Sequence, residues 1–139
     1  MPAVLKDFPD TRYHAEAHLV TWHPRGVLDD ELADRIIAFI EAEERIADAP
    51  FHRYMDLNGL TEIRLKFGHV FQISERRRAG YAGEPVKSAF CCEWAIGLGM
   101  ARLYQELMQG GPIEVRAFRS REAAAQWLGV PEDILLPNE

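Results

Sequence analysis

A cluster of mostly polar residues begins at Asp56, near the end of an apolar run, and their types could support binding. In an open α/β sheet such a junction is the carboxyl end of a strand, where ligands and partners usually bind. The side chains could hold a partner segment or a small polar ligand above the start of the next helix. Alternatively, Asp56 and Asn58 satisfy only the amides of their own turn. The candidate partner- or ligand-binding residues are Asp56, Asn58, Thr61, Glu62, Arg64 and Phe67.

His23 is the candidate for acid–base chemistry, because an imidazole changes its charge near neutral pH. It could act as an acid or base if it faced Asp56 across neighbouring strand ends, which makes an enzyme the least favoured of three interpretations. A packing role at the end of a strand is the favoured interpretation of His23. No serine lies in a Gly-x-Ser-x-Gly elbow, so a serine hydrolase has no support. No catalytic residue is assigned.

The spacing of histidines and glycines does not indicate a metal or cofactor site. His14 and His18 are expected on an extended segment, which would separate them by about 13 Å. Gly97 and Gly99 lack the third glycine of a dinucleotide-binding loop, because Arg102 occupies that position. A close approach of a helix to the sheet explains these glycines better than a ligand at the helix start. No metal and no cofactor are predicted.

The two cysteines, Cys91 and Cys92, are adjacent in the sequence. The favoured interpretation is that both are small apolar residues at the end of a buried strand. A reactive thiol would need a lowered pKa and some exposure to solvent. Glu93 is next to the pair and argues against a stabilised thiolate.

Composition indicates one globular domain over residues 1–139, with its core at about 15–130. The net charge is −6, from 22 acidic and 16 basic residues, which disfavours non-specific binding to nucleic acid or to anionic membranes. Arg76, Arg77 and Arg78 could serve an anionic ligand or acidic partner, but a solvated helix end is favoured. The first residues lack a signal-peptide pattern, and no apolar run could span a membrane. A cytoplasmic protein is expected.

Hydrophobic periodicity alternates between strand and helix along the whole chain. The helix after the Asn58-Gly59 turn is expected to bury Phe67, Val70 and Phe71, and the tail from Pro131 is expected to be loose. The pattern predicts an α/β fold: a single-layer mixed, mostly parallel sheet of four to five strands with about four helices. The predicted strands are 18–23, paired with 11–16 as a hairpin arm, then 51–57, 86–92 and 113–118; the predicted helices are 30–47, 65–79, 95–109 and 121–129.

Two features resemble a known family. Asp56-Leu57 ends the second major strand, as in the STAS domain, the fold of sulfate-transporter tails and anti-sigma-factor antagonists. The closing segment, EVRAFRSREAAAQWL, resembles more specifically the bacterial SpoIIAA-like proteins, which end in a strand with an aromatic residue and then a Trp-Leu helix. The resemblance covers roughly residues 15–130 and implies a STAS-like sheet. The matching residues are Phe118, Glu122, Ala123, Ala124, Trp127 and Leu128.

The chain departs from this family at the phosphorylation site. In anti-sigma-factor antagonists the loop after Asp-Leu ends in Asp-Ser-Ser-Gly, and a kinase phosphorylates one of the serines. Here the corresponding positions hold Arg64, Leu65, Lys66 and Phe67, so the serine switch is not implied. Thr61 is the nearest hydroxyl, but a phosphate there would lie beside acidic residues that repel it, unless Arg64 turned inward.

The sequence therefore favours a small cytoplasmic, non-catalytic STAS-like module with a regulatory or protein-interaction role. It would dock a protein partner, or a second copy of itself, through the loop at 56–67 and the following helix. The alternative is a carrier or sensor of a small apolar or anionic molecule, held between the helix starting near Arg64 and the one starting near Ala95. Since the SpoIIAA-like group is related by fold to lipid-transfer domains, the resemblance supports a lipid-like ligand for this alternative.

Overall fold

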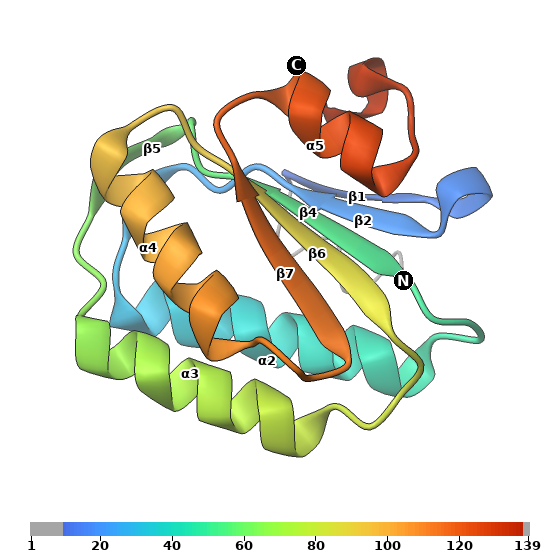
Figure 1. The fold of residues 1–139 in the computed structure, drawn as a ribbon, viewed down its shortest axis with the longest axis horizontal. Coiled ribbons are helices and arrows are strands. Elements are labelled where there is room, and N and C mark those ends of the chain that lie inside the picture. The colour runs from blue at the N-terminus through green and yellow to red at the C-terminus, as the bar shows by residue number, and fades with distance from the viewer. Residues whose placement is uncertain (1–9, 138–139) are drawn as a thin grey trace.

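The computed structural model describes residues 10–137 (Figure 1). Residues 1–9, on which the expectation about a signal peptide largely rests, lie outside this range. The described part is an α/β structure with a mixed, mostly parallel sheet, which confirms the predicted class. Its elements are β1 (Thr11–His14), β2 (Leu19–Trp22), β3 (Gly26–Leu28), α2 (Asp30–Ile46), β4 (His52–Asp56), β5 (Leu60–Ile63), α3 (Phe67–Gly80), β6 (Val86–Cys91), α4 (Ala95–Leu107), β7 (Ile113–Phe118) and α5 (Arg121–Leu128), with short 3-10 turns at Ala15–Ala17 (η1) and Glu132–Leu135 (η2).

The main sheet has five strands in the order β1-β2-β4-β6-β7. β1 and β2 form the predicted antiparallel hairpin, and β2, β4, β6 and β7 are parallel neighbours. The register places Asp56 beside Cys91, and Cys91 beside Phe118. The carboxyl ends of three strands therefore meet at one edge of the sheet, where the candidate residues begin.

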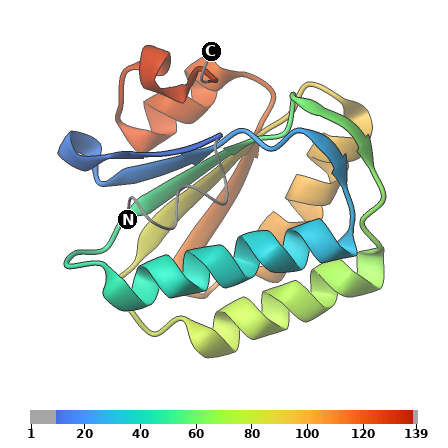
Figure 2. The same cartoon turned by 180° about the vertical axis from the view of Figure 1, so that it is seen from behind.

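The two faces of the sheet are covered by different helices. α2 and α3 lie on one side of the sheet, and α5 lies on the other (Figures 1 and 2). Side chains alternate accordingly, because successive residues of a strand point to opposite faces. Met55 and Phe90 pack into the cluster with α2 and α3, whereas Tyr54 and Ala89 pack with α5. The predicted faces of residues 51–57 are confirmed.

Local signals explain where the helices begin and end. Asp29 caps α2, because its Oδ1 accepts a hydrogen bond from the Leu32 amide at 2.8 Å. Ser120 caps α5 in the same way by accepting from the Ala123 amide at 3.2 Å. α5 ends at Gly129, whose φ of 74° suits a residue without a side chain. Such caps satisfy amides that a helix start leaves without partners.

A second, two-stranded parallel sheet joins β3 and β5, and the sequence did not predict it. β5 lies inside the segment expected to be a loop leading directly into a helix, so that expectation is wrong. Leu60 of β5 is buried, and the Arg64 amide donates to the Leu28 carbonyl at 2.7 Å. The strands are too short to show a period, which is why the pattern missed them.

The tail is also more ordered than expected. Leu135, in the turn η2, is fully buried against Leu19, Tyr54 and Ala124. The expectation of a loose tail from Pro131 is therefore wrong for residues 131–135. The tail forms part of the layer that covers the α5 side of the sheet.

An ion cluster connects three elements on the other side. Glu44 of α2 binds Arg53 of β4 at 2.9 Å and Arg77 of α3, whose Nη1 lies 3.0 Å from Glu44 Oε1. Arg53 and Arg77 are both buried. The expectation of a fully solvated basic helix end is therefore wrong for Arg77. Arg76 remains partly exposed, and its Nε donates to Glu41 at 3.0 Å.

Candidate functional site

The structure divides the six candidate residues into two groups. Asp56 and Asn58 point into the protein at the carboxyl ends of β4 and β6, where their own chain satisfies them. The other four lie on the outside of β5 and at the start of α3: Thr61, Glu62, Arg64 and Phe67, all exposed. The two groups therefore have different tasks.

Asp56 is the centre of a buried polar network, with only 1% of its surface exposed. Its Oδ2 accepts hydrogen bonds from the Tyr54 hydroxyl and from the Arg121 Nε, both at 2.7 Å. Its Oδ1 accepts from the Asn58 amide at 3.0 Å. Burial alone would lower the pKa of Arg121, but the hydrogen bond and charge of Asp56 outweigh burial and raise it. The network fastens the start of α5 to the sheet.

Asn58 connects the ends of two neighbouring strands. Its side-chain oxygen accepts from the Glu93 amide at 2.8 Å, and its amide nitrogen lies 3.9 Å from Cys91 Sγ. Cys91 and Cys92 are both fully buried and unpaired, as expected for small apolar residues at a strand end. Burial, followed by the negative charge of Asp56, raises the pKa of Cys91 to about 11. Neither feature is that of a reactive thiol.

His23 does not bind Asp56. The His23 Nε2 donates to the Leu135 carbonyl at 2.8 Å, and its ring packs against Tyr54 with centroids 6.0 Å apart. Tyr54 thus contacts both residues, and within residues 10–137 no hydrogen bond or ion pair joins His23 to Asp56 directly. A general base must reach the proton that it removes. The arrangement gives His23 the packing role that the sequence favoured.

The outward group forms a charged strand followed by an exposed aromatic residue. Arg64 pairs with Glu62 two residues earlier, with Nη2 to Oε1 at 3.2 Å. The Lys66 amide donates to Asp30 Oδ1 at 3.1 Å, which fixes the start of α3 to the start of α2. Phe67 is 66% exposed and Phe71 is 47% exposed. The expectation that these two residues point inward is therefore wrong.

The exposed aromatics lie on the side of α3 that faces α4. Phe67, Phe71 and Arg78 share one side of the helix by their spacing, and the Arg78 guanidinium donates to the Leu107 and Gln109 carbonyls at the end of α4. The opposite side of α3 faces α2, since His69 binds Asp34 at 2.7 Å. The two helices are close at their ends and splay apart at their starts (Figure 1).

An apolar cleft lies between the sheet and the helices α2, α3 and α4, and we call it the α3–α4 cleft. It has a volume of about 100 Å³. Ile96, 69% exposed, lies one turn before the lining residue Met100, so exposed apolar side chains flank the cleft on both helices. Almost all lining residues are apolar: Leu28, Ala33, Ile36, Ile37, Met55, Leu57, Leu65, Val70, Ile73, Phe90, Met100, Ala101 and Tyr104.

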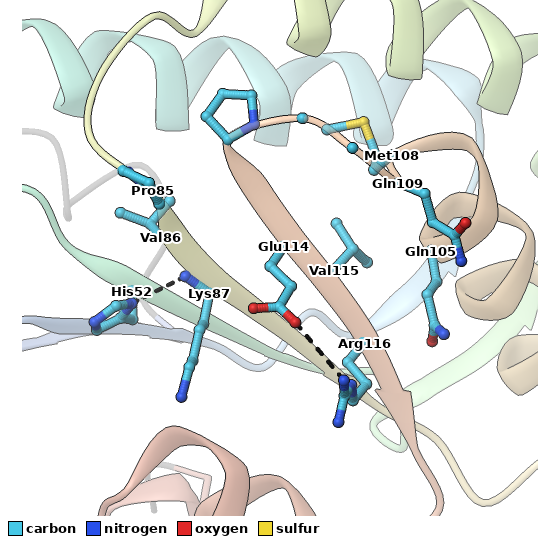
Figure 3. Close-up of a pocket in the computed structure, with 13 residues that line it drawn as sticks. His52, Pro85, Val86, Lys87, Gln105, Met108, Gln109, Glu114, Val115 and Arg116 are labelled. Carbon is cyan, nitrogen blue, oxygen red and sulfur yellow. Dashed lines mark hydrogen bonds and ion pairs between the residues drawn. The ribbon is translucent and has the colours of Figure 1, made fainter.

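A second hollow lies at the other end of the sheet, beside β7 (Figure 3). It is a groove of about 580 Å³ between the outer side of β7 and the end of α4, and it extends over the start of β6. Polar side chains line much of it, including Lys87, Gln105, Glu114 and Arg116. Lys87 is already engaged by its own chain, because its Nζ donates to the Trp127 carbonyl at 2.8 Å.

Sequence reasoning missed Arg121 and Tyr54 as partners of Asp56. Arg121 lies far from Asp56 in the sequence, and only the register of β4, β6 and β7 brings α5 above the strand end. The alternation along residues 51–57 did place Tyr54 and Asp56 on one face, which was the available signal. The exposure of Phe71 and Ile96 was also missed, because helical spacing groups each of them with apolar residues and gives no sign that they face solvent.

No protein-family model, curated protein or solved structure matches the chain. Within residues 10–137, no helix is both long and apolar enough to cross a membrane. In the same range, histidine, cysteine and acidic side chains form no cluster of three or more that could bind a metal ion.

Proposed function

We propose that the protein is a small, non-catalytic, STAS-like module of the cytoplasm that docks a protein partner in the α3–α4 cleft. The observation that carries this proposal is the exposure of Phe67, Phe71 and Ile96 around an apolar cleft. Large apolar side chains gathered on a surface mark interaction sites more often than scattered ones do. An amphipathic helix that lies across the exposed aromatic side chains, with one apolar side chain entering the cleft, is the partner shape that suits this surface.

The charged strand beside the cleft supports this proposal. Thr61, Glu62 and Arg64 are exposed next to the start of α3, and a polar rim around an apolar centre is the usual composition of a protein interface. Rim charges act mainly on specificity and on the rate of association. We therefore assign anchoring to Phe67 and Ile96, and selection of the partner to Glu62 and Arg64.

The docking would be constitutive with respect to serine phosphorylation. The positions that hold the phosphorylated loop of anti-sigma-factor antagonists are Arg64 to Phe67 here, and Phe67 is the first residue of α3. A phosphate on Thr61 would lie on the same strand as Glu62, which opposes its charge. The STAS-like architecture is thus proposed without the switch of that family.

Site-specific photo-crosslinking in the host cell tests the proposal. A photoreactive phenylalanine at position 67 should capture one defined protein, whereas the same group at Gln126, exposed on α5 on the other face of the sheet, should not. The captured protein is then purified, and its dissociation constant is measured by calorimetry. Phe67→Ser and Ile96→Ser should each weaken binding at least about tenfold, as for anchor residues. Equal capture at both positions, or no binding by the purified pair, would refute the proposal.

A second candidate function is the carriage or sensing of a small apolar ligand in the same cleft. The supporting observation is its nearly uniform apolar lining, at the place between two helices where the sequence analysis expected a ligand. An apolar cavity of about 150 Å³ in another protein stays dry and binds benzene. Benzene is therefore a suitable probe, and chemical shift changes should be confined to lining residues such as Met100. Ala101→Leu, which fills the cavity, should abolish those changes; their persistence would contradict ligand carriage.

A further inference from the structure

The outer edge of β7 carries backbone groups without a strand to bind them. β7 is the last strand of the sheet, and in the described part of the chain only β6 pairs with it. A parallel strand at an edge presents every second residue's N–H and C=O to the outside. An open edge is a ready template for another strand.

The hydrogen bonds show which residues face outward. The Val86 amide donates to the Pro112 carbonyl at 3.0 Å, and the Cys92 amide donates to the Phe118 carbonyl at 3.0 Å. The backbone N–H and C=O groups of the even-numbered residues of β7 therefore point towards β6. The backbone N–H and C=O groups of Ile113, Val115 and Ala117 point outward. The Ala117 amide confirms this direction, because it donates to the Gln105 side chain at 2.9 Å.

There is room for a strand beside this edge. The groove of about 580 Å³ runs past Glu114, Val115 and Arg116 (Figure 3). Its other wall is the end of α4, from which Gln105 extends, and the turn after the helix, which contains Gln109. The edge is thus open around Val115 and partly protected at Ala117.

The charges on β7 specify an occupant. Glu114 and Arg116 lie on one face of the strand, both about half exposed, and contact each other at 3.7 Å. In an antiparallel pair centred on Val115, Glu114 lies directly across from Arg116 of the other strand, and the two-fold axis repeats the contact. A register centred on Glu114 or on Arg116 would instead place like charges across from each other, which destabilises a pair of strands.

We propose that β7 is a self-association edge, at which a second copy of this chain adds its own β7 antiparallel and centred on Val115. The two Val115 residues exchange both N–H and C=O bonds, as in a hydrogen-bonded antiparallel pair. Ile113 then lies across from Ala117 of the other copy. The Ala117 amide gives up its hydrogen bond to Gln105 and binds the second strand instead. The interface is closed by its two-fold symmetry, and it lies apart from the α3–α4 cleft.

Charge exchange tests this register. Sedimentation velocity over a range of concentrations measures the dimerisation constant of the full chain. Glu114→Arg and Arg116→Glu each place like charges across the axis, and each should weaken dimerisation at least about tenfold. An equimolar mixture of the two variants should recover it, because the mixed dimer has opposite charges in both contacts. The double variant Glu114→Arg/Arg116→Glu should also dimerise as the original chain does.

Matched controls separate this register from general effects of charge. Glu75→Arg on α3 and Arg45→Glu on α2 make the same charge changes at exposed positions away from the edge, and they should leave the dimerisation constant unchanged. A chain that stays monomeric at all concentrations would overturn the proposal and assign Glu114, Arg116 and Gln105 to protection of the edge. Dimers that are insensitive to both single variants, or a mixture that fails to recover, would overturn it as well.

Discussion

Asp56 illustrates how one residue can look functional in a sequence and be structural in the fold. A carboxylate at the carboxyl end of a strand is a common binding group, but here Tyr54, Arg121 and the Asn58 amide occupy both of its oxygens. Removing the charge would leave a partly buried guanidinium without its counterion. The exposed residues of the same segment, Thr61, Glu62 and Arg64, hold no buried charge in place.

We expect Asp56→Asn to lower the free energy of unfolding by about 2–3 kcal/mol, since a hydrogen-bonded charge pair is broken at a buried site. Glu62→Gln is the matched control, because it breaks an exposed pair with Arg64 and should cost no more than about 0.5 kcal/mol. Urea unfolding followed by tryptophan fluorescence measures both. Equal losses in the two variants would show that Asp56 does not fasten α5 to the sheet.

The two thiols should be inert in the native state. Because burial and Asp56 raise the pKa of Cys91 to about 11, we expect no reaction with Ellman's reagent at pH 8 until denaturant is added. An unfolded thiol ionises near its usual pKa of 9.0, so ionisation favours the unfolded chain above that pH. Stability should be retained below pH 9 and fall as the pH rises from 9 towards 11, and Cys91→Ala should reduce that slope. A native thiol that reacts within seconds would contradict the burial of both cysteines.

At the scale of elements, α4 and the end of β6 are in close contact through Gly97. A Cβ on Gly97 would lie 2.4 Å from Cys92 Sγ and 3.2 Å from Ile63 Cδ1, so a side chain does not fit without movement. This is the close approach of helix and sheet that the sequence favoured for both Gly97 and Gly99, and it is confirmed for Gly97 only. Gly99, two residues later, has no neighbour within 4 Å of a Cβ. A side chain therefore fits at Gly99 but not at Gly97.

We expect Gly99→Ala to stabilise the protein by about 0.5–1 kcal/mol, since alanine favours a helix interior over glycine. Gly97→Ala gains the same propensity but overfills the contact with Cys92, and it should destabilise by about 1–3 kcal/mol. Cys92→Ala removes the clashing sulfur and should recover most of the loss when combined with Gly97→Ala. Thermal unfolding measures the stability of the original chain, Gly99→Ala, Gly97→Ala and the double variant Gly97→Ala/Cys92→Ala. Equal effects of the two alanines would contradict the close approach.

Much of the element order could be predicted from periodicity, and the reasons for the exceptions are physical. The helix at 30–46 and the strand at 113–118 carry full apolar repeats, whereas β3 and β5 are too short to carry one. Phe67 and Phe71 were misplaced because an aromatic residue at helical spacing is usually buried. The link from Asp56 to Arg121 depends on strand order, which no local pattern contains.

At the scale of the whole molecule, the α2 side of the sheet is joined by charge as well as by apolar packing. Glu44 holds two buried arginines, from β4 and from α3. Its loss would leave both cations facing each other in a buried site. A buried ion pair is weak evidence for stability when intact, but it is costly to break.

We expect Glu44→Gln to lower the free energy of unfolding by about 3–5 kcal/mol, as for other broken buried pairs. Glu41→Gln is the control, because its main partner Arg76 is substantially exposed and its contact with buried Arg77 is longer, at 3.8 Å. Exposed pairs contribute about 0–1 kcal/mol. Guanidinium unfolding followed by circular dichroism should give a single transition for both variants. A loss below about 1 kcal/mol for Glu44→Gln would mean that water or rearranged side chains replace the carboxylate.

The turn η2 has a practical consequence for handling the protein. Leu135 fills a site against Leu19 and Tyr54, and its carbonyl receives the buried His23 N–H. Ending the chain at Ile134 would therefore leave a cavity where Leu135 packs on the sheet. It would also remove the carbonyl that accepts the hydrogen bond from His23. A fusion tag joined after Pro137 leaves Leu135 in place. The choice of a few residues at that junction therefore decides whether a recombinant protein keeps the packing of η2 on the sheet.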